Sequence, residues 1–84
     1  MFYVYLLQSR KDLKFYIGST NDLKKRFKEH SEGKVFSTRP RRPLDLIYYE
    51  AYKTESGARK REKSLKYRGR ARAQLLKRIT EGLV

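Results

Sequence analysis

Arg26 and His30 are two polar residues with complementary chemistry, one helical turn apart in the stretch YIGSTNDLKKRFKEH. Arginine can hold a phosphate through two hydrogen bonds with a charge that does not titrate away, and an imidazole can donate or accept a proton near neutral pH. Such a pair suits phosphodiester chemistry. The alternative is that both residues lie on the solvated edge of an amphipathic helix, where charged residues are common.

Glu62 is the one carboxylate in the basic run ARKREKSLK. In a helix it would share an inward-facing side with Ala58 and Leu65, which lie four residues before it and three residues after it. A carboxylate that points inward needs a partner. That partner is either a cation of the same helix, Lys66 or Arg59, or a hard divalent metal ion, which prefers oxygen ligands.

Three tyrosines, Tyr3, Tyr5 and Tyr16, could supply phenol groups to the same site. They fall in residues 2–8 and 14–19, which are rich in β-branched and aromatic residues and predict a β-hairpin. Because side chains alternate along a strand, Tyr3 and Tyr5 share one face. Ordinary packing of a sheet would explain all three rings, and a catalytic phenolic face is the alternative.

The helix that carries Arg26 and His30 is expected to span roughly twelve residues and to end near Gly33. Leu23 and Phe27 supply its apolar stripe, and the candidate N-cap residues are Thr20, Asn21 and Asp22. Just before this helix, Gly18 closes the second strand. A residue without a Cβ atom lets a backbone or a ligand approach closely.

The segment GKVFSTRPRRP contains both prolines of the chain and predicts an irregular basic loop, because proline disfavours helices and central strands. Residues 44–52 predict a third strand. A second helix is expected to run to about Tyr67, with Thr54 or Ser56 as its N-cap. After an interruption at Gly69, a third helix is expected, with one apolar side formed by Leu75, Leu76, Ile79 and Leu83.

These elements predict a single domain over residues 1–84 with a mixed α/β (α+β) fold and the order ββαβαα. An 84-residue chain has room for one modest core. There is no apolar run long enough to cross a bilayer and no signal-peptide pattern, so membrane association is not expected. The chain has no cysteine, which excludes disulfides and thiolate zinc sites and fits a cytoplasmic location.

The net charge of +13, from 22 basic and 9 acidic residues, favours a nucleic-acid partner. Ten of the basic residues and only two of the acids follow Ser56, so charge concentrates in the last two helices. The residues expected to contact backbone phosphates are Arg39, Arg41, Arg42, Arg59, Arg61, Lys66, Arg68, Arg70 and Arg72.

The ordered set of Tyr3-Val4-Tyr5, Tyr16-Ile17-Gly18, Arg26, His30 and Glu62 resembles the GIY-YIG nuclease superfamily, in particular its small stand-alone bacterial members. The second motif, YIG, is literal. The first appears as YVY, with tyrosine in place of the eponymous glycine. The specificity lies in the order and the spacing of the whole set, because each tripeptide alone is a weak signal.

The resemblance implies a small three-stranded antiparallel sheet flanked by helices, and hydrolysis of DNA phosphodiester bonds with one divalent ion, Mg²⁺ or Mn²⁺. It further implies that Tyr5 or Tyr16 polarises or deprotonates the attacking water, Arg26 binds the scissile phosphate, His30 orients or protonates within the tyrosine network, and Glu62 holds the metal. Ionising a phenol at pH 7 costs roughly 4 kcal/mol. We therefore expect nearby cations to lower the pKa of the tyrosine.

Many members of that family place an asparagine late in the domain, whereas the one asparagine here is Asn21. Gln74 is the candidate replacement. The expected function is a DNA endonuclease with weak or structure-based specificity, and DNA repair or recombination is one expected setting. Two alternatives stay open: a catalytically silent nucleic-acid-binding module that keeps the fold, and a ribosome-associated or other RNA-binding basic protein.

Overall fold

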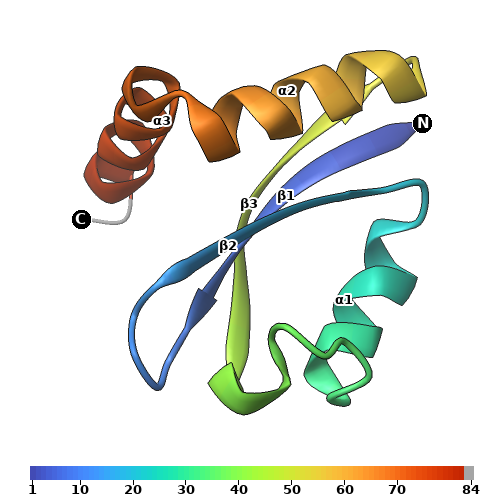
Figure 1. The fold of residues 1–84 in the computed structure, drawn as a ribbon, viewed down its shortest axis with the longest axis vertical. Coiled ribbons are helices and arrows are strands. Elements are labelled where there is room, and N and C mark those ends of the chain that lie inside the picture. Colours follow the sequence, from blue (N-terminus) through green and yellow to red (C-terminus); the bar gives the residue numbers. More distant parts are fainter. Residues whose placement is uncertain (83–84) are drawn as a thin grey trace.

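The computed structural model describes residues 1–82, and it confirms the order ββαβαα (Figure 1). Three strands form one antiparallel sheet in the order β2-β1-β3. The elements are β1 (Phe2–Ser9), β2 (Phe15–Thr20), α1 (Leu23–Ser31), the 3₁₀ turn η1 (Arg39–Arg41), β3 (Leu44–Tyr52), α2 (Glu55–Tyr67) and α3 (Gly69–Gly82).

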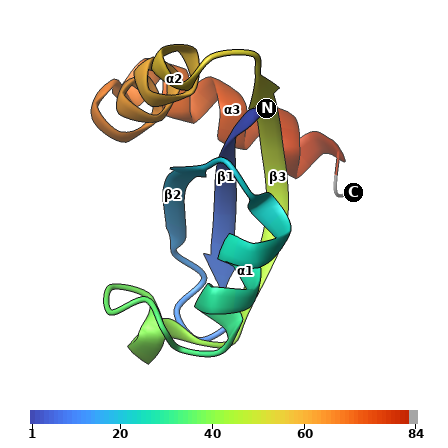
Figure 2. The same ribbon diagram turned by 90° about the vertical axis from the view of Figure 1, so that its right-hand side faces the viewer.

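The central strand β1 is buried on both faces, because helices cover the sheet from two sides (Figure 2). Its even-numbered residues, such as Val4 and Leu6, pack with Leu65 of α2 and Leu75 of α3. Its odd-numbered residues, Tyr5 among them, pack on the other face with residues of α1. The sheet therefore separates two small cores, and the face that contacts α1 is the one with the predicted phenolic side chains.

Helix α1 begins after Asp22, whose side chain accepts a hydrogen bond from the Lys25 backbone N–H at 3.1 Å. The helix ends at Ser31, so it is shorter than the predicted twelve residues. Gly33 follows with a φ of 78°, a left-handed conformation that favours glycine and stops the helix.

The prediction that the loop after α1 is wholly irregular is wrong. Arg39–Arg41 form a short 3₁₀ turn with Pro40 in its first turn. Proline fits there because the first residues of a helical turn have no intrahelical acceptor for an N–H group, and its fixed φ suits the turn.

Helix α2 is capped by Thr54, whose hydroxyl accepts a hydrogen bond from the Gly57 N–H at 3.1 Å. Helix α3 follows after Arg68, and its Leu75, Leu76 and Ile79 pack on the core shared with α2, as predicted. Leu83, which was expected on the same side, lies outside the described residues. Within residues 1–82 no helix is long and apolar enough to span a membrane.

Candidate active site

Three rings from different elements form one cluster on the α1 face of the sheet. Tyr5 comes from β1, Tyr16 from β2 and His30 from the end of α1. The Tyr5 and Tyr16 ring centroids are 6.5 Å apart, and the His30 ring lies 5.6 Å from Tyr5 and 5.2 Å from Tyr16. Tyr3 packs instead against Tyr49, with ring centroids 6.1 Å apart. The fold therefore brings together two of the three tyrosines and the histidine.

Gly18 makes room for the Tyr5 ring. The two residues are paired across β1 and β2. A Cβ atom at Gly18 would lie 2.6 Å from Cζ of Tyr5, a distance that side chains do not tolerate. The close approach that the glycine suggested is thus made by an aromatic ring of the protein itself, and the glycine fixes the place of the Tyr5 hydroxyl.

His30 is fully buried, so it does not lie on a solvated helix edge. Its Nε2 lies 2.9 Å from the Tyr5 hydroxyl, and its Nδ1 lies 2.7 Å from Oγ1 of Thr38. Burial, with a smaller contribution from the charge of Arg26, lowers the pKa of His30 from its usual 6.5 to about 4. The imidazole is therefore neutral at pH 7 and carries a single N–H.

Arg26 lies between the ring cluster and solvent. Its side chain is 36% exposed, and Nη1 is 3.4 Å from Oε1 of Glu29, one turn further along α1. Burial raises the pKa of Tyr5, and the neighbouring Arg26 guanidinium acts in the opposite direction without outweighing it. The expectation of a lowered tyrosine pKa is therefore wrong for Tyr5 in the free protein, where the phenol is protonated at pH 7.

Glu62 points inward from α2, as its spacing from Ala58 and Leu65 predicted. Its side chain is 19% exposed, its Oε1 accepts a hydrogen bond from Ser19 Oγ at 2.5 Å, and its Oε2 lies 2.8 Å from Nζ of Lys66. Burial raises the pKa of Glu62, but the hydrogen bonds from Lys66 and Ser19 outweigh it and hold the pKa below the usual value. The carboxylate is ionised at neutral pH.

Glu62 and the ring cluster lie on opposite sides of strand β2. Ser19, which holds Glu62, alternates with Gly18 along β2 and so faces α2, whereas Tyr5 and Tyr16 face α1. Within residues 1–82 no hydrogen bond or ion pair joins Glu62 directly to either ring. The structure therefore puts the ring cluster and Glu62 on different faces of the sheet, separated by the edge strand β2, and not on the single surface that was expected.

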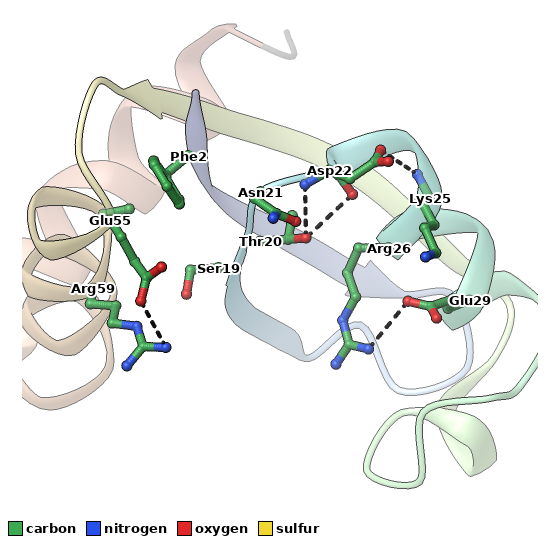
Figure 3. Close-up of a pocket in the computed structure, with 11 residues that line it drawn as sticks. Phe2, Ser19, Thr20, Asn21, Asp22, Lys25, Arg26, Glu29, Glu55 and Arg59 are labelled. Carbon is green, nitrogen blue, oxygen red and sulfur yellow. Dashed lines mark hydrogen bonds and ion pairs between the residues drawn. The ribbon is translucent and has the colours of Figure 1, made fainter.

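A cleft of about 410 Å³ crosses this edge between α1 and α2. Figure 3 shows Arg26 reaching into it from α1 and Arg59 from α2, with the Ser19 hydroxyl between them. Ser19 and Arg59 also line the adjoining hollow of about 600 Å³ that contains Glu62. The two hollows therefore share a wall, and a substrate that lies along β2 would meet both Arg26 and Glu62.

The donor set at Glu62 fits a divalent ion that is shared with a substrate. Among the described residues, no three His, Asp or Glu side chains gather to form a complete metal cage. Mg²⁺ commonly takes one or two carboxylates and keeps waters and phosphate oxygens as its other ligands. A single ionised carboxylate beside the Ser19 hydroxyl meets that need, provided that the Lys66 ammonium releases Oε2.

Arg61 was expected to contact phosphate, but the structure gives it another partner. Its Nε and Nη2 donate to Glu50 of β3 at 2.9 and 3.1 Å, and its side chain is 28% exposed. The Glu50 carboxylate also accepts hydrogen bonds from Tyr48 and Tyr52. This cluster joins α2 to β3 on the side of the helix away from the cleft.

The other predicted phosphate ligands fall into two groups. Three arginines of the loop before β3 brace the backbone: Arg39 donates to the Gly33 carbonyl, Arg42 to the Arg39 carbonyl and Arg41 to the Phe15 carbonyl. The other group belongs to α2, its end and α3. In it, Arg59 pairs with Glu55, and Lys66 pairs with Glu62. Among residues 1–82, three further members are exposed and have no side-chain partner: Arg68, Arg70 and Arg72.

Two contributors to the site were not found from the sequence. Ser19 follows the YIG motif by one position, and its alternation with Gly18 could have placed it opposite α2. Thr38 lies in the loop that was expected to be irregular, and no local pattern connects it with His30. The proposed replacement of the late asparagine, Gln74, is exposed on α3 and makes no side-chain hydrogen bond with the described residues.

A family model described as the GIY-YIG catalytic domain matches residues 1–79. The chain belongs to the GIY-YIG family. The matched range includes every residue of the ring cluster as well as Arg26 and Glu62.

Proteins of similar length and sequence are known from several bacteria. A UPF0213 protein of Syntrophus aciditrophicus is 39% identical over 94% of this chain and 93% of its own length, and a UPF0213 protein of Staphylococcus epidermidis is 40% identical over 95% of both. The solution NMR structure of the UPF0213 protein BH0048 from Bacillus halodurans is 34% identical and superposes with a TM-score of 0.58, covering 92% of this chain and 84% of that one.

Proposed function

We propose that this protein is a metal-dependent endonuclease that hydrolyses DNA phosphodiester bonds with weak or structure-based specificity. The observation that carries the proposal is the cleft along β2, into which Arg26 projects from one side while Glu62 lies in the adjoining hollow behind Ser19. A phosphodiester laid across this edge would face the guanidinium of Arg26 and the carboxylate of Glu62.

Arg26 is the candidate ligand of the scissile phosphate. Its 3.4 Å contact with Glu29 is loose, and both side chains are about one-third exposed, so the pair adds little stability and a phosphate can replace the carboxylate. A fixed guanidinium near the non-bridging oxygens offsets the charge that grows on them in the transition state. Arg59, on the opposite wall, would hold the neighbouring part of the backbone.

Glu62 is the candidate metal ligand, with the Ser19 hydroxyl as its support. A divalent ion bound there would stabilise negative charge on the phosphate oxygens. Tyr16 is the phenol with better access to an attacking water, because it is half-buried and lines a hollow with Lys66, whereas Tyr5 is only 2% exposed. Tyr5 and His30, which are buried beneath Tyr16 and Arg26, would then fix the positions of these two side chains.

The test is incubation of single-stranded, duplex, flapped and branched oligonucleotides with Mg²⁺ or Mn²⁺. We expect wild-type cleavage that EDTA abolishes, and a loss of about 100-fold or more in Glu62→Ala. Glu32→Ala is the control, because it also removes one carboxylate, but Glu32 is exposed, pairs with Lys34 after α1 and lines neither hollow. Equal cleavage by wild type and Glu62→Ala would refute the proposal.

A second candidate function is a nucleic-acid-binding module without efficient catalysis. The Lys66 ammonium already neutralises Glu62, which favours this alternative. It predicts salt-sensitive binding of DNA or RNA that EDTA does not change, with no product from any of the substrates above. A strong preference for RNA would point to the RNA-binding alternative.

A further inference from the structure

Thr38 is the inner end of a buried chain of three hydrogen-bonding side chains. The exposed fractions of Thr38, His30 and Tyr5 are 0%, 0% and 2%. Thr38 contacts Nδ1 of His30, and Nε2 of His30 contacts the hydroxyl of Tyr5. The chain therefore links the loop after α1 with the ring cluster at the centre of the sheet.

The positions of the protons in this chain follow from what each group must satisfy. A neutral imidazole has one N–H donor and one acceptor nitrogen. Within residues 1–82 the Thr38 hydroxyl has a single side-chain partner, which is Nδ1 of His30. If Nδ1 carried the proton, the buried Thr38 hydroxyl would have no acceptor for its own proton, and a buried donor without a partner is costly.

Tyr5 differs from Thr38 because it neighbours Arg26, which lines the open cleft. In the inferred arrangement the hydroxyl proton of Tyr5 points toward that cleft, where water can accept it. The two contact lengths agree with this assignment. Hydroxyl donors make shorter hydrogen bonds than N–H donors on average. The Thr38 contact is 2.7 Å and the Tyr5 contact is 2.9 Å, as expected if the hydroxyl donates to Nδ1 and the Nε2–H donates to Tyr5.

We propose that Thr38 is a positioning residue that donates a hydrogen bond to Nδ1 of His30, holds His30 in its Nε2–H form, and so makes His30 a hydrogen-bond donor to the Tyr5 oxygen. His30 then does not accept the phenol proton. Any proton that Tyr5 releases leaves on the side of Arg26 and the cleft, and the Nε2–H and the guanidinium both stabilise the phenolate that remains.

The tautomer can be read directly, because His30 is the single histidine of the chain. The probe is long-range ¹H–¹⁵N NMR of the imidazole in the full-length protein at pH 7. We expect a protonated Nε2 and an unprotonated Nδ1 that is shifted by an accepted hydrogen bond. A proton on Nδ1 would overturn the inference, whatever the activity of the protein.

The variant Thr38→Val removes the hydroxyl with little change in shape. We expect the Nδ1 resonance to move to that of an unbonded nitrogen or to average between tautomers, and Thr38→Ser to restore it. Thr80→Val is the control, since Thr80 lies on α3 and its hydroxyl donates to the Leu76 carbonyl. An unchanged Nδ1 resonance in Thr38→Val overturns the inference; if that variant fails to fold, the wild-type tautomer and Thr38→Ser decide.

The catalytic meaning of Thr38 rests on the proposed function, and cleavage kinetics test it separately. We expect Thr38→Val to lower kcat roughly 5- to 10-fold, which corresponds to one neutral hydrogen bond, without a change in KM because Thr38 is buried away from DNA. Thr38→Ser should recover kcat. No cleavage by wild type would refute the proposed function and leave the tautomer result standing. Full activity of Thr38→Val would refute the positioning role.

Discussion

Both oxygens of Glu62 are engaged by the protein itself, one by the Ser19 hydroxyl and one by the Lys66 ammonium. A divalent ion at this carboxylate competes with Lys66, because it would bring a second positive charge next to the ammonium, and like charges repel strongly at such short range. We therefore predict that Lys66→Met binds Mn²⁺ about tenfold more tightly than wild type, a change of the size of one charge-assisted hydrogen bond. Calorimetry or Mn²⁺ paramagnetic resonance measures it.

Lys63→Met is the control for charge alone. Lys63 lies on the same helix and lines the same hollow, but it has no ion pair with Glu62. If both variants tighten Mn²⁺ binding equally, Lys66 acts only through the general field, and direct competition is refuted.

His30 gives the fold a dependence on pH. Its pKa is lowered to about 4 in the folded protein, so on acidification the unfolded chain takes up the proton first, near its usual 6.5. Stability is therefore full above pH 6.5 and falls as the pH drops toward 4, with about 2 kcal/mol lost by pH 5. Urea unfolding at pH 7.5 and pH 5 measures this loss.

His30→Gln removes the titrating group and should flatten this dependence between pH 6.5 and 5, even though it lowers stability at pH 7.5. If His30→Gln loses as much free energy of unfolding between pH 7.5 and pH 5 as wild type does, the loss comes from carboxylates and not from His30. The pKa values of Glu50 and Glu62 are lowered in the folded protein. Their contributions to stability are therefore lost only when the pH falls below the usual pKa of a carboxyl group, which lies below the pH range in which His30 acts.

At the scale of single residues, the sequence identified side chains by type but not by environment. The spacing of Arg26 and His30 placed them correctly beside the apolar stripe of α1, yet it could not show that His30 is buried and Arg26 is not, because that depends on where Thr38 and Tyr5 come to lie. Long-range contacts of this kind are decided by the fold as a whole.

Helix α2 is held to the sheet by neighbouring residues that point to opposite edges. Arg61 bonds Glu50 on β3, and Glu62 bonds Ser19 on β2. We predict that Glu50→Gln lowers the free energy of unfolding by about 2 to 3 kcal/mol, because it leaves Arg61 largely buried without a charge partner. The same change should weaken Mn²⁺ binding at Glu62, since α2 loses one of its two anchors.

Arg59→Met is the matched comparison in a urea titration. Arg59 and Glu55 are 72% and 56% exposed, so loss of their pair should change stability by less than about 1 kcal/mol. Equal losses in Glu50→Gln and Arg59→Met would show that the Glu50 cluster does not anchor the helix.

The elements themselves were largely predictable, because local signals and tertiary contacts agree. Asp22 and Thr54 cap the helices where expected, and strand alternation assigned the two faces of β1 correctly. The 3₁₀ turn around Pro40 was missed since proline signals both a loop and the first turn of a helix.

For the whole molecule, the sequence predicted the amount of charge and its concentration toward the C-terminus, but not which cations are free. Ion pairs with acids of distant segments, such as Arg61 with Glu50 and Arg10 with Asp45, remove some arginines from the available surface. In contrast, Arg68, Arg70 and Arg72 stand at the junction of α2 and α3 with exposed side chains and no partner in the part of the chain that the structure describes.

This junction should therefore carry most of the phosphate contacts. We predict that the triple variant Arg68→Gln, Arg70→Gln, Arg72→Gln makes the dependence of DNA affinity on salt shallower by about 2.7 log units per log unit of salt, because each neutralised phosphate contributes about 0.9. Fluorescence anisotropy with a labelled oligonucleotide between low and physiological salt measures the slope.

A second triple variant, Lys24→Gln, Lys28→Gln, Lys34→Gln, lowers the net charge by the same amount at exposed positions of α1 and the turn after it, which lie away from the α2–α3 junction (Figure 1). We expect it to keep the wild-type slope and to weaken binding only slightly. If the two variants change the slope equally, DNA binding depends on the total charge of +13, and the phosphate contacts are not concentrated at the α2–α3 junction.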